Sequence, residues 1–243
     1  MLMKMVTKRK DATTNTIIMT IADHRWQDLV VNWMACLHRL RLSNYIIISA
    51  DPQLHDALGR IGAPSFYRSV FFNPYSGSGG GGDGGAKGDR YRGAVWSYRW
   101  QLIGSVLKRG VHVVHIDIDA LLVRNFAPML QALVGAGSGG VFGSSSSSGG
   151  GGVATATAGG AGGGGPNQAA SFAAAAPVRP GGGVPPHVVF SRGSKLAADM
   201  LGLGFAFLRS SPQTLAFLPK FQALAQRTLD DNRAANLILN TGK

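Results

Sequence analysis

Short apolar runs alternate with helical periodicity along the first part of the chain. Residues 16–21 (TIIMTI) and 45–49 (YIIIS) are β-branched runs that predict buried strands. Apolar residues recur with the helical period over residues 28–40, and a shorter helix is expected over residues 53–60. This order of strand, helix, strand and helix is typical of an α/β protein with a mainly parallel sheet.

Predicted strands and helices continue to the end of the chain, but they are more widely spaced. An apolar run over residues 66–72 precedes a helix expected over residues 95–107, and residues 111–116 (VHVVHI) form the most strand-like segment. Further strands are expected at 187–190 and 205–208, and two helices at 212–229 and 231–239.

Two glycine-rich stretches, residues 76–93 and 135–186, interrupt this pattern and hold most of the 35 glycines. The second contains runs of Ser, Gly and Ala that offer little side chain to bury, so it predicts a disordered insertion. The predicted organisation is a basic tail over residues 1–15 and one α/β domain built from residues 16–134 and 187–243, separated by the insertion at 135–186.

The composition excludes several function classes. The formal net charge is +12, and all 12 acidic residues are Asp, so mechanisms that need Glu are ruled out. The basic residues are scattered, which argues against a nucleic-acid partner, although they favour anionic ligands in general. Neither a signal peptide nor a membrane-spanning apolar segment is evident, and the single Cys36 is expected to be a core residue.

The most informative motif is Asp117-Ile118-Asp119, directly after the strand predicted at 111–116. Alternate residues of a strand point to the same face, so the two carboxylates can project together and hold a hard divalent cation against phosphate groups. The alternative is that both acids only end the strand and start a turn.

Several segments together resemble the nucleotide-diphospho-sugar transferase family, within glycosyltransferase family 77. The main match is residues 96–125 (WSYRWQLIGSVLKRGVHVVHIDIDALLVRN), which include the Asp-x-Asp motif. Residues 16–33, 45–51, 204–214 and 230–236 resemble other family segments in the same order along the chain.

The resemblance implies a GT-A-like single domain that transfers a sugar from a nucleotide diphosphate donor with retention of configuration. Asp117 and Asp119 would bind Mn²⁺ or Mg²⁺ against the diphosphate. The donor is expected to be a UDP-sugar carrying a pentose or galactose, and the acceptor a glycoprotein or polysaccharide. The resemblance also implies the Golgi lumen, although no signal or membrane anchor is evident in this sequence.

Further site residues follow from the same resemblance. The catalytic candidates are Asp231 and Asn232, and the substrate-binding candidates are Thr20, Ala22, Asp23, Asp51, Arg99, Gly204 and Asn236. Alternatives remain open from the residues alone. Asp23, Asp51 and the pair of Asp230 and Asp231 could be helix caps or turn acids, and Arg99 could be a solvated helix residue.

Two departures from the family leave a second function open. Asn232 stands where the family has Gln, and the late His that family members carry beyond the last helix is not matched by any of the six histidines. We therefore expect a C-terminally truncated domain. The alternative to an active transferase is a non-catalytic remnant that binds a nucleotide sugar or an anionic partner without turnover.

Overall fold

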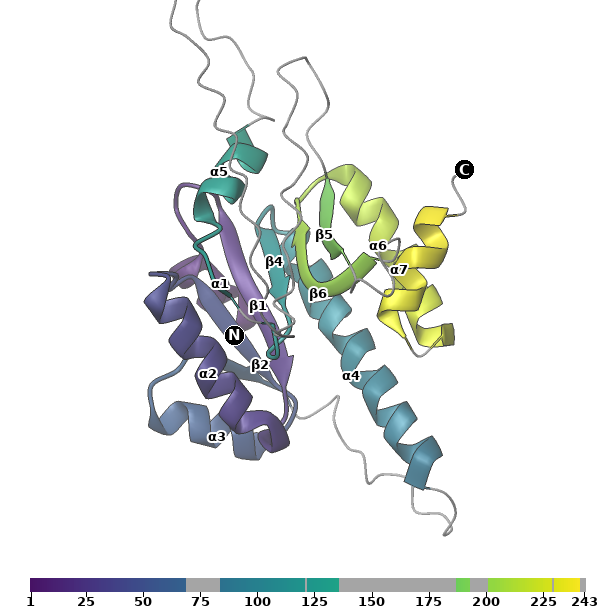
Figure 1. The fold of residues 1–243 in the computed structure, drawn as a ribbon, viewed down its shortest axis with the longest axis horizontal. Helices are drawn as coiled ribbons and strands as arrows, with labels where there is room; N and C mark the ends of the chain where they lie inside the picture. The colour runs from purple at the N-terminus through teal and green to yellow at the C-terminus, as the bar shows by residue number, and fades with distance from the viewer. Residues whose placement is uncertain (69–83, 121, 136–186, 193–200, 229, 241–243) are drawn as a thin grey trace, which may run out of the picture.

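A six-stranded sheet with helices on both faces forms the described part of the chain (Figure 1). The computed structural model describes residues 1–68, 84–120, 122–135, 187–192, 201–228 and 230–240. Within these ranges the strand order is β3-β2-β1-β4-β6-β5. The mixed α/β class predicted from the sequence is therefore confirmed.

Four neighbouring strands are parallel, and two strands extend the sheet antiparallel to them. The parallel strands are β1 (Thr16–Ala22), β2 (Tyr45–Ser49), β3 (Ser65–Tyr67) and β4 (His112–Ile116). Strand β6 (Leu201–Leu208) pairs antiparallel with β4, and β5 (Val188–Arg192) pairs antiparallel with β6. The four parallel strands agree with the mainly parallel sheet predicted from the sequence, and the two antiparallel strands form one edge of the sheet.

One face of the sheet is covered by α2 (Gln27–Arg39), α3 (Pro52–Arg60) and α5 (Ala127–Gly135). Side chains that alternate along the strands, such as Ile18, Ile47 and Val114, pack there against Trp33 and Leu37 of α2. The predicted period-two and helical patterns thus meet in one apolar layer.

The opposite face packs against α1 (Leu2–Arg9), α4 (Gly84–Leu107), α6 (Pro212–Thr228) and α7 (Asp231–Asn240). The other set of alternating strand residues, including Ile17 and Val113, contacts Trp100 of α4 and Phe221 of α6. The rings of these two aromatic residues meet edge to face at 4.7 Å between centroids. The domain is therefore a sheet between two helical layers.

The structure differs from the sequence prediction in three places. The segment expected to be a basic tail contains α1, whose Leu2 and Val6 are buried against the core. Helix α4 starts at Gly84, inside the glycine-rich stretch 76–93, and α5 was not predicted. Of the predicted insertion 135–186, Gly135 ends α5 and residues 136–186 lie outside the described residues.

The strand order defines where a ligand can bind. The chain runs from β1 outward to β2 and β3, and then returns to place β4 on the other side of β1. At such a reversal, the connections after the two neighbouring strands leave in opposite directions and open a crevice outside their carboxyl ends. The carboxyl ends of β1 and β4 carry Ala22 and Ile116, so the crevice lies beside the Asp-x-Asp motif.

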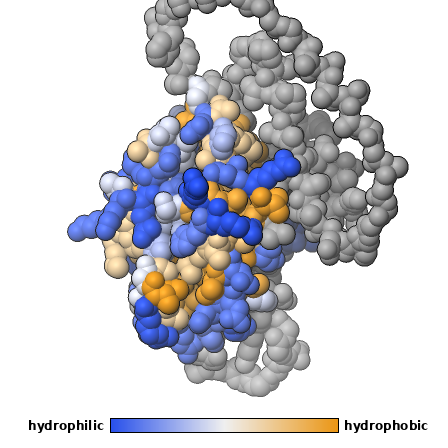
Figure 2. Space-filling model, turned by 60° about the vertical axis from the view of Figure 1, so that its left-hand side comes forward, coloured by the Kyte–Doolittle hydropathy of each residue, from blue (hydrophilic) through white to orange (hydrophobic). Residues whose placement is uncertain are grey.

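The outer surface is largely polar on the face shown in Figure 2. Hydrophilic side chains cover most of its described part, and the hydrophobic ones form small separate patches. This agrees with the interpretation of the scattered basic residues as a solvated surface. Within the described ranges, the helices include none that is both long and apolar enough to cross a membrane.

Candidate functional site

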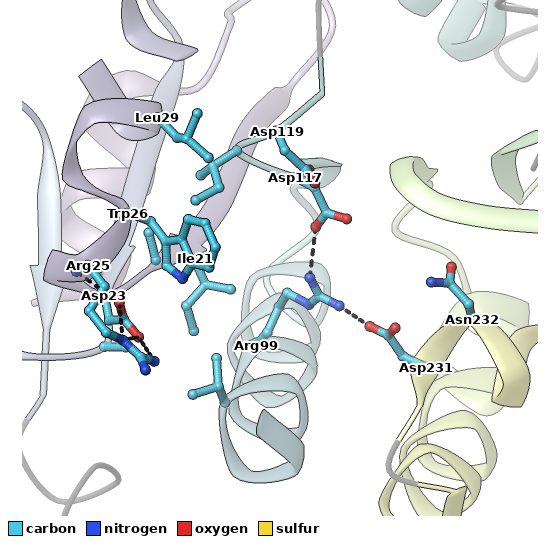
Figure 3. A pocket seen from close by; sticks show the side chains of 14 residues that line it. Ile21, Asp23, Arg25, Trp26, Leu29, Arg99, Asp117, Asp119, Asp231 and Asn232 are labelled. Atoms are coloured by element: carbon cyan, nitrogen blue, oxygen red, sulfur yellow. Dashed lines mark hydrogen bonds and ion pairs between the residues drawn. The ribbon is translucent and has the colours of Figure 1, made fainter. Parts of the chain in front are cut away.

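A pocket of about 610 Å³ opens at the crevice between β1 and β4 (Figure 3). Its charged lining consists of four carboxylates and two guanidinium groups, so its formal charge is −2 on a chain of net charge +12. These groups are Asp23, Asp117, Asp119, Asp231, Arg25 and Arg99. The pocket is therefore locally anionic and suits a cation, in spite of the basic chain around it.

Asp117 follows the last residue of β4 and is held by its backbone and one carboxylate oxygen. Its amide donates to the carbonyl of Gly204 on β6 at 2.9 Å. Its Oδ1 accepts from the guanidinium of Arg99 at 3.0 Å and lies 2.9 Å from Nε2 of His115. Burial raises the pKa of Asp117, but hydrogen bonds and charge from His115 and Arg99 outweigh it and lower the pKa to about 2. Asp117 is therefore ionised at neutral pH.

His115 is fully buried below the pocket and supports Asp117. Its Nδ1 lies 3.1 Å from the carbonyl oxygen of Met19, which can only accept, so Nδ1 carries the proton. Its Nε2 lies 2.9 Å from a terminal nitrogen of Arg99 and 2.9 Å from Oδ1 of Asp117. Burial and then the charge of Arg99 lower the pKa of His115, although Asp117 and the carbonyl of Met19 act in the opposite direction. His115 faces its protein partners, as expected for a core histidine.

Arg99 is the centre of a buried ion-pair network. Its side chain is 5 % exposed, one terminal nitrogen contacts Asp117, and the other forms a close ion pair with Asp231. The alternative of a solvated helix residue is therefore wrong. The expected contact with the diphosphate stays a prediction; in the structure Arg99 lines the pocket and its two terminal nitrogens bind carboxylates.

The two acids at the start of α7 have different roles. Asp230 accepts from the amide of Arg233 at 3.0 Å and caps the helix, which matches the capping alternative. Asp231 is 4 % exposed and binds Arg99, with Trp100 Nε1 as a second donor at 3.3 Å. Asn232 is exposed and lines the pocket. Asn236 was predicted to bind substrate, but its side chain lies outside the part of the chain that the structure describes.

The predicted residues of β1 and β2 divide between the pocket and its support. Ala22 and Asp23 line the pocket. Asp23 also caps the short 3₁₀ helix η1 (His24–Trp26) and accepts from the side chain of Arg25 through both carboxylate oxygens. Thr20 is buried and absent from the lining. Asp51 caps α3 and binds the backbone amide of His24 at 2.7 Å, so it acts as a cap, as the alternative predicted.

Asp117 and Asp119 supply the oxygen donors that a hard cation needs. Asp119 is exposed and lines the same pocket, and Gly204 lies beside the second oxygen of Asp117. Among the described residues, no cluster of three or more His, Cys or Asp side chains could hold a metal ion. The pair therefore fits a cation that completes its coordination with phosphate oxygens and water, as Mg²⁺ and Mn²⁺ sites do.

The apolar side of the pocket was not predicted from the sequence. Trp26 is 52 % exposed and lines the pocket together with Ile21 and Leu29, on the side away from Asp231 (Figure 3). Val95 is a further apolar residue of the lining. The sequence signal that could have identified Trp26 is its position, three residues after Asp23 at the carboxyl end of a predicted strand. An aromatic ring beside an anionic pocket can stack on a planar ligand group.

Comparison with known proteins supports the family inferred from the motifs. Residues 40–159 match the model of the nucleotide-diphospho-sugar transferase family, and this stretch includes Arg99, Asp117 and Asp119. The chain is also similar to the β-arabinofuranosyltransferase RAY1 of Arabidopsis thaliana, with 25% identity over 117 residues. That alignment covers 48% of this chain and 21% of the relative, so the chain spans about a fifth of its length. The resemblance is confirmed at the level of the nucleotide-diphospho-sugar transferase family.

Proposed function

We propose that the domain has a GT-A-like fold and transfers a pentose from a UDP-sugar to a glycoprotein or polysaccharide, with retention of configuration. The cation is Mn²⁺ or Mg²⁺ held by Asp117 and Asp119. The relative named as an arabinofuranosyltransferase favours a pentose over galactose. The proposed place of action is the Golgi lumen, as the family resemblance implies.

The observation that carries this proposal is the anionic pocket at the reversal of strand order. A nucleotide diphosphate is itself an anion, so a pocket of formal charge −2 would repel it. A divalent cation on Asp117 and Asp119 removes this conflict and, when bound, stabilises the charge that develops on the leaving diphosphate. The ionised state of Asp117 supports this assignment.

The two sides of the pocket fit the two ends of a nucleotide. Trp26 with Ile21 and Leu29 offers an aromatic and apolar wall for the base, and the acidic motif lies across the pocket for the diphosphate (Figure 3). Asn232 lines the pocket at the start of α7, and in this proposal its amide binds the sugar. Asp231, the other catalytic candidate, lines the pocket in an ion pair with Arg99.

The direct test is titration of the chain with UDP in the presence of Mn²⁺ and again with excess chelator. We expect UDP to bind with Mn²⁺ and to bind at least tenfold more weakly without it. Release of UDP from a UDP-pentose would then distinguish an active transferase from a non-catalytic binding domain. Equal affinity with and without the cation would overturn the proposed role of the acidic pair.

A further inference from the structure

One guanidinium group connects the proposed cation site to the opposite wall of the pocket. Arg99 lies on α4 and binds Asp117 after β4 through one nitrogen and Asp231 at the start of α7 through the other. Arg99 and Asp231 are each 4 % exposed, so water screens their interaction poorly. A change in the position or charge of one carboxylate therefore acts on the other through Arg99.

At one end, this network fixes the orientation of the Asp117 carboxylate. Both Arg99 and Nε2 of His115 lie against the same oxygen, Oδ1. The second oxygen, Oδ2, is the atom nearest to the missing side chain of Gly204. Asp117 thus has one oxygen held by the protein and one oxygen left for a single bond to a cation. Carboxylate ligands held in this way by neighbouring groups bind metals more tightly than mobile ones.

At the other end, Asp231 balances the charge of Arg99. Without Asp231, the guanidinium would be paired with Asp117 alone, so more of its positive charge would act at the proposed cation site. Trp100 Nε1 donates to the same oxygen of Asp231 that binds Arg99, which fixes this carboxylate from a second direction. The next residue, Asn232, lines the pocket.

We propose that Arg99 is a positioning residue that couples the cation site at Asp117 to the start of α7 through Asp231. This inference rests on the proposed function, because it requires that Asp117 binds a cation. It assigns to Asp231 an effect on cation affinity although Asp231 does not contact the cation. It also explains why a buried arginine lies directly below the acidic motif.

The test measures Mn²⁺ binding alone, by electron paramagnetic resonance, without nucleotide and in about 0.3 M KCl to screen charges that act through solvent. We expect Asp231→Asn to weaken Mn²⁺ binding by 10-fold or more, the usual effect of removing a group that supports a metal ligand. Asp23→Asn is the matched control. It also removes one pocket carboxylate paired with an arginine, but its partner is Arg25. We expect at most a threefold loss for the control.

A second variant and a double-mutant cycle separate coupling from a purely structural role. Arg99→Lys keeps the positive charge but cannot reach both carboxylates, so Mn²⁺ binding should again fall about 10-fold. In an Arg99→Met background, Asp231→Asn should change Mn²⁺ binding by less than twofold, because the connection is already lost. Thermal unfolding of each variant shows that it is folded.

The outcomes distinguish this inference from the proposed function. If the parent chain binds Mn²⁺ neither alone nor together with UDP, the cation site itself is wrong and the coupling is wrong with it. If it binds Mn²⁺ only together with UDP, the same variants are compared with UDP present. If the parent binds Mn²⁺ and Asp231→Asn matches Asp23→Asn, only the coupling through Arg99 is overturned. The same holds if Arg99→Lys lowers the melting temperature and leaves Mn²⁺ affinity unchanged.

Discussion

Gly204 lies against the carboxylate of Asp117 where β4 and β6 meet at the pocket. The amide of Asp117 donates to the carbonyl of Gly204 at 2.9 Å, and a Cβ at this glycine would lie 3.8 Å from Oδ2. That distance is an ordinary contact for one methyl group, whereas a branched side chain would reach the oxygen proposed to bind the cation.

Two substitutions at Gly204 therefore should give different results. We expect Gly204→Ala to keep Mn²⁺ affinity within twofold, and Gly204→Val to weaken it about 10-fold by displacing a metal ligand. Electron paramagnetic resonance of Mn²⁺ titrations gives both values. Equal affinities for the two variants would mean that Oδ2 is not the ligand atom.

The exposed acid of the motif offers a second test. Asp119→Asn should abolish metal-dependent binding of UDP while it preserves or raises the stability of the cation-free chain, because one of two adjacent like charges is removed. If Asp119 only formed a turn, the same change would leave UDP binding intact and cost a small amount of stability. Calorimetric titration and thermal unfolding of one variant distinguish the two roles.

The apolar wall of the pocket predicts base stacking. Trp26→Ala should weaken UDP binding by about 10-fold, since stacking of a base on an aromatic side chain contributes about 1–3 kcal/mol. Trp26→Phe should retain most of the affinity, and neither change should affect binding of Mn²⁺ alone. Since the side chain is 52 % exposed, the melting temperature should change little. Unchanged UDP affinity in Trp26→Ala would place the base elsewhere.

Most of the sheet was predictable because its signals are local. Strand β2 has the bounds that its apolar run predicted, and α2 and β4 begin within one residue of the expected positions. The carboxyl-end placement of Asp117 followed from the same local pattern. Such segments carry their own periodicity, so their assignment needs no knowledge of distant partners.

The ion pairs inside the site were not predictable, because they join residues that lie far apart in the sequence. Arg99 is separated from Asp117 by 18 positions and from Asp231 by 132, and nothing local distinguishes it from a solvated helix arginine. Asp230 caps α7 whereas Asp231 binds Arg99, and this difference depends in the same way on which helix packs beside α7. Ion-pair partners are set by tertiary contacts, which one sequence does not reveal.

His112 predicts a measurable pH dependence of stability. Its Nδ1 accepts a hydrogen bond from the amide of Ser210 at 2.9 Å, which requires an unprotonated nitrogen. Burial, and then the charge of Arg209, lowers the pKa of His112 below its usual value of 6.5. The unfolded chain therefore takes up a proton at higher pH than the folded chain, so stability is lost as the pH falls below about 6.5.

Replacement of His112 removes that contribution. Between pH 6.5 and pH 5, we expect the free energy of unfolding of His112→Gln to depend less steeply on pH than that of the parent. One proton limits the difference to about 1.4 kcal/mol per pH unit. Urea unfolding at several pH values gives both slopes, and identical slopes would contradict a neutral folded His112.

Two helical glycines should respond to alanine in opposite directions. Gly59 is exposed in α3, and a Cβ there would meet nothing within 4 Å. Gly59→Ala should therefore stabilise the chain by about 0.5 kcal/mol, through the helix propensity of alanine near a helix end. A Cβ at Gly104 of α4 would instead lie 2.7 Å from Cδ2 of Leu218, which is buried on α6. Gly104→Ala should cost about 1–2 kcal/mol, because the leucine must move within a packed core.

The leucine itself provides the control for this last prediction. In a Leu218→Ala background the close contact is gone, and Gly104→Ala should become neutral or stabilising, as at Gly59. Urea unfolding of the four chains in this cycle measures the coupling between the two positions. If Gly104→Ala destabilises the chain equally with and without Leu218, the cost does not come from the contact between α4 and α6. The glycine would then be required by the backbone of α4 rather than by the packing that holds Arg99 beneath the pocket.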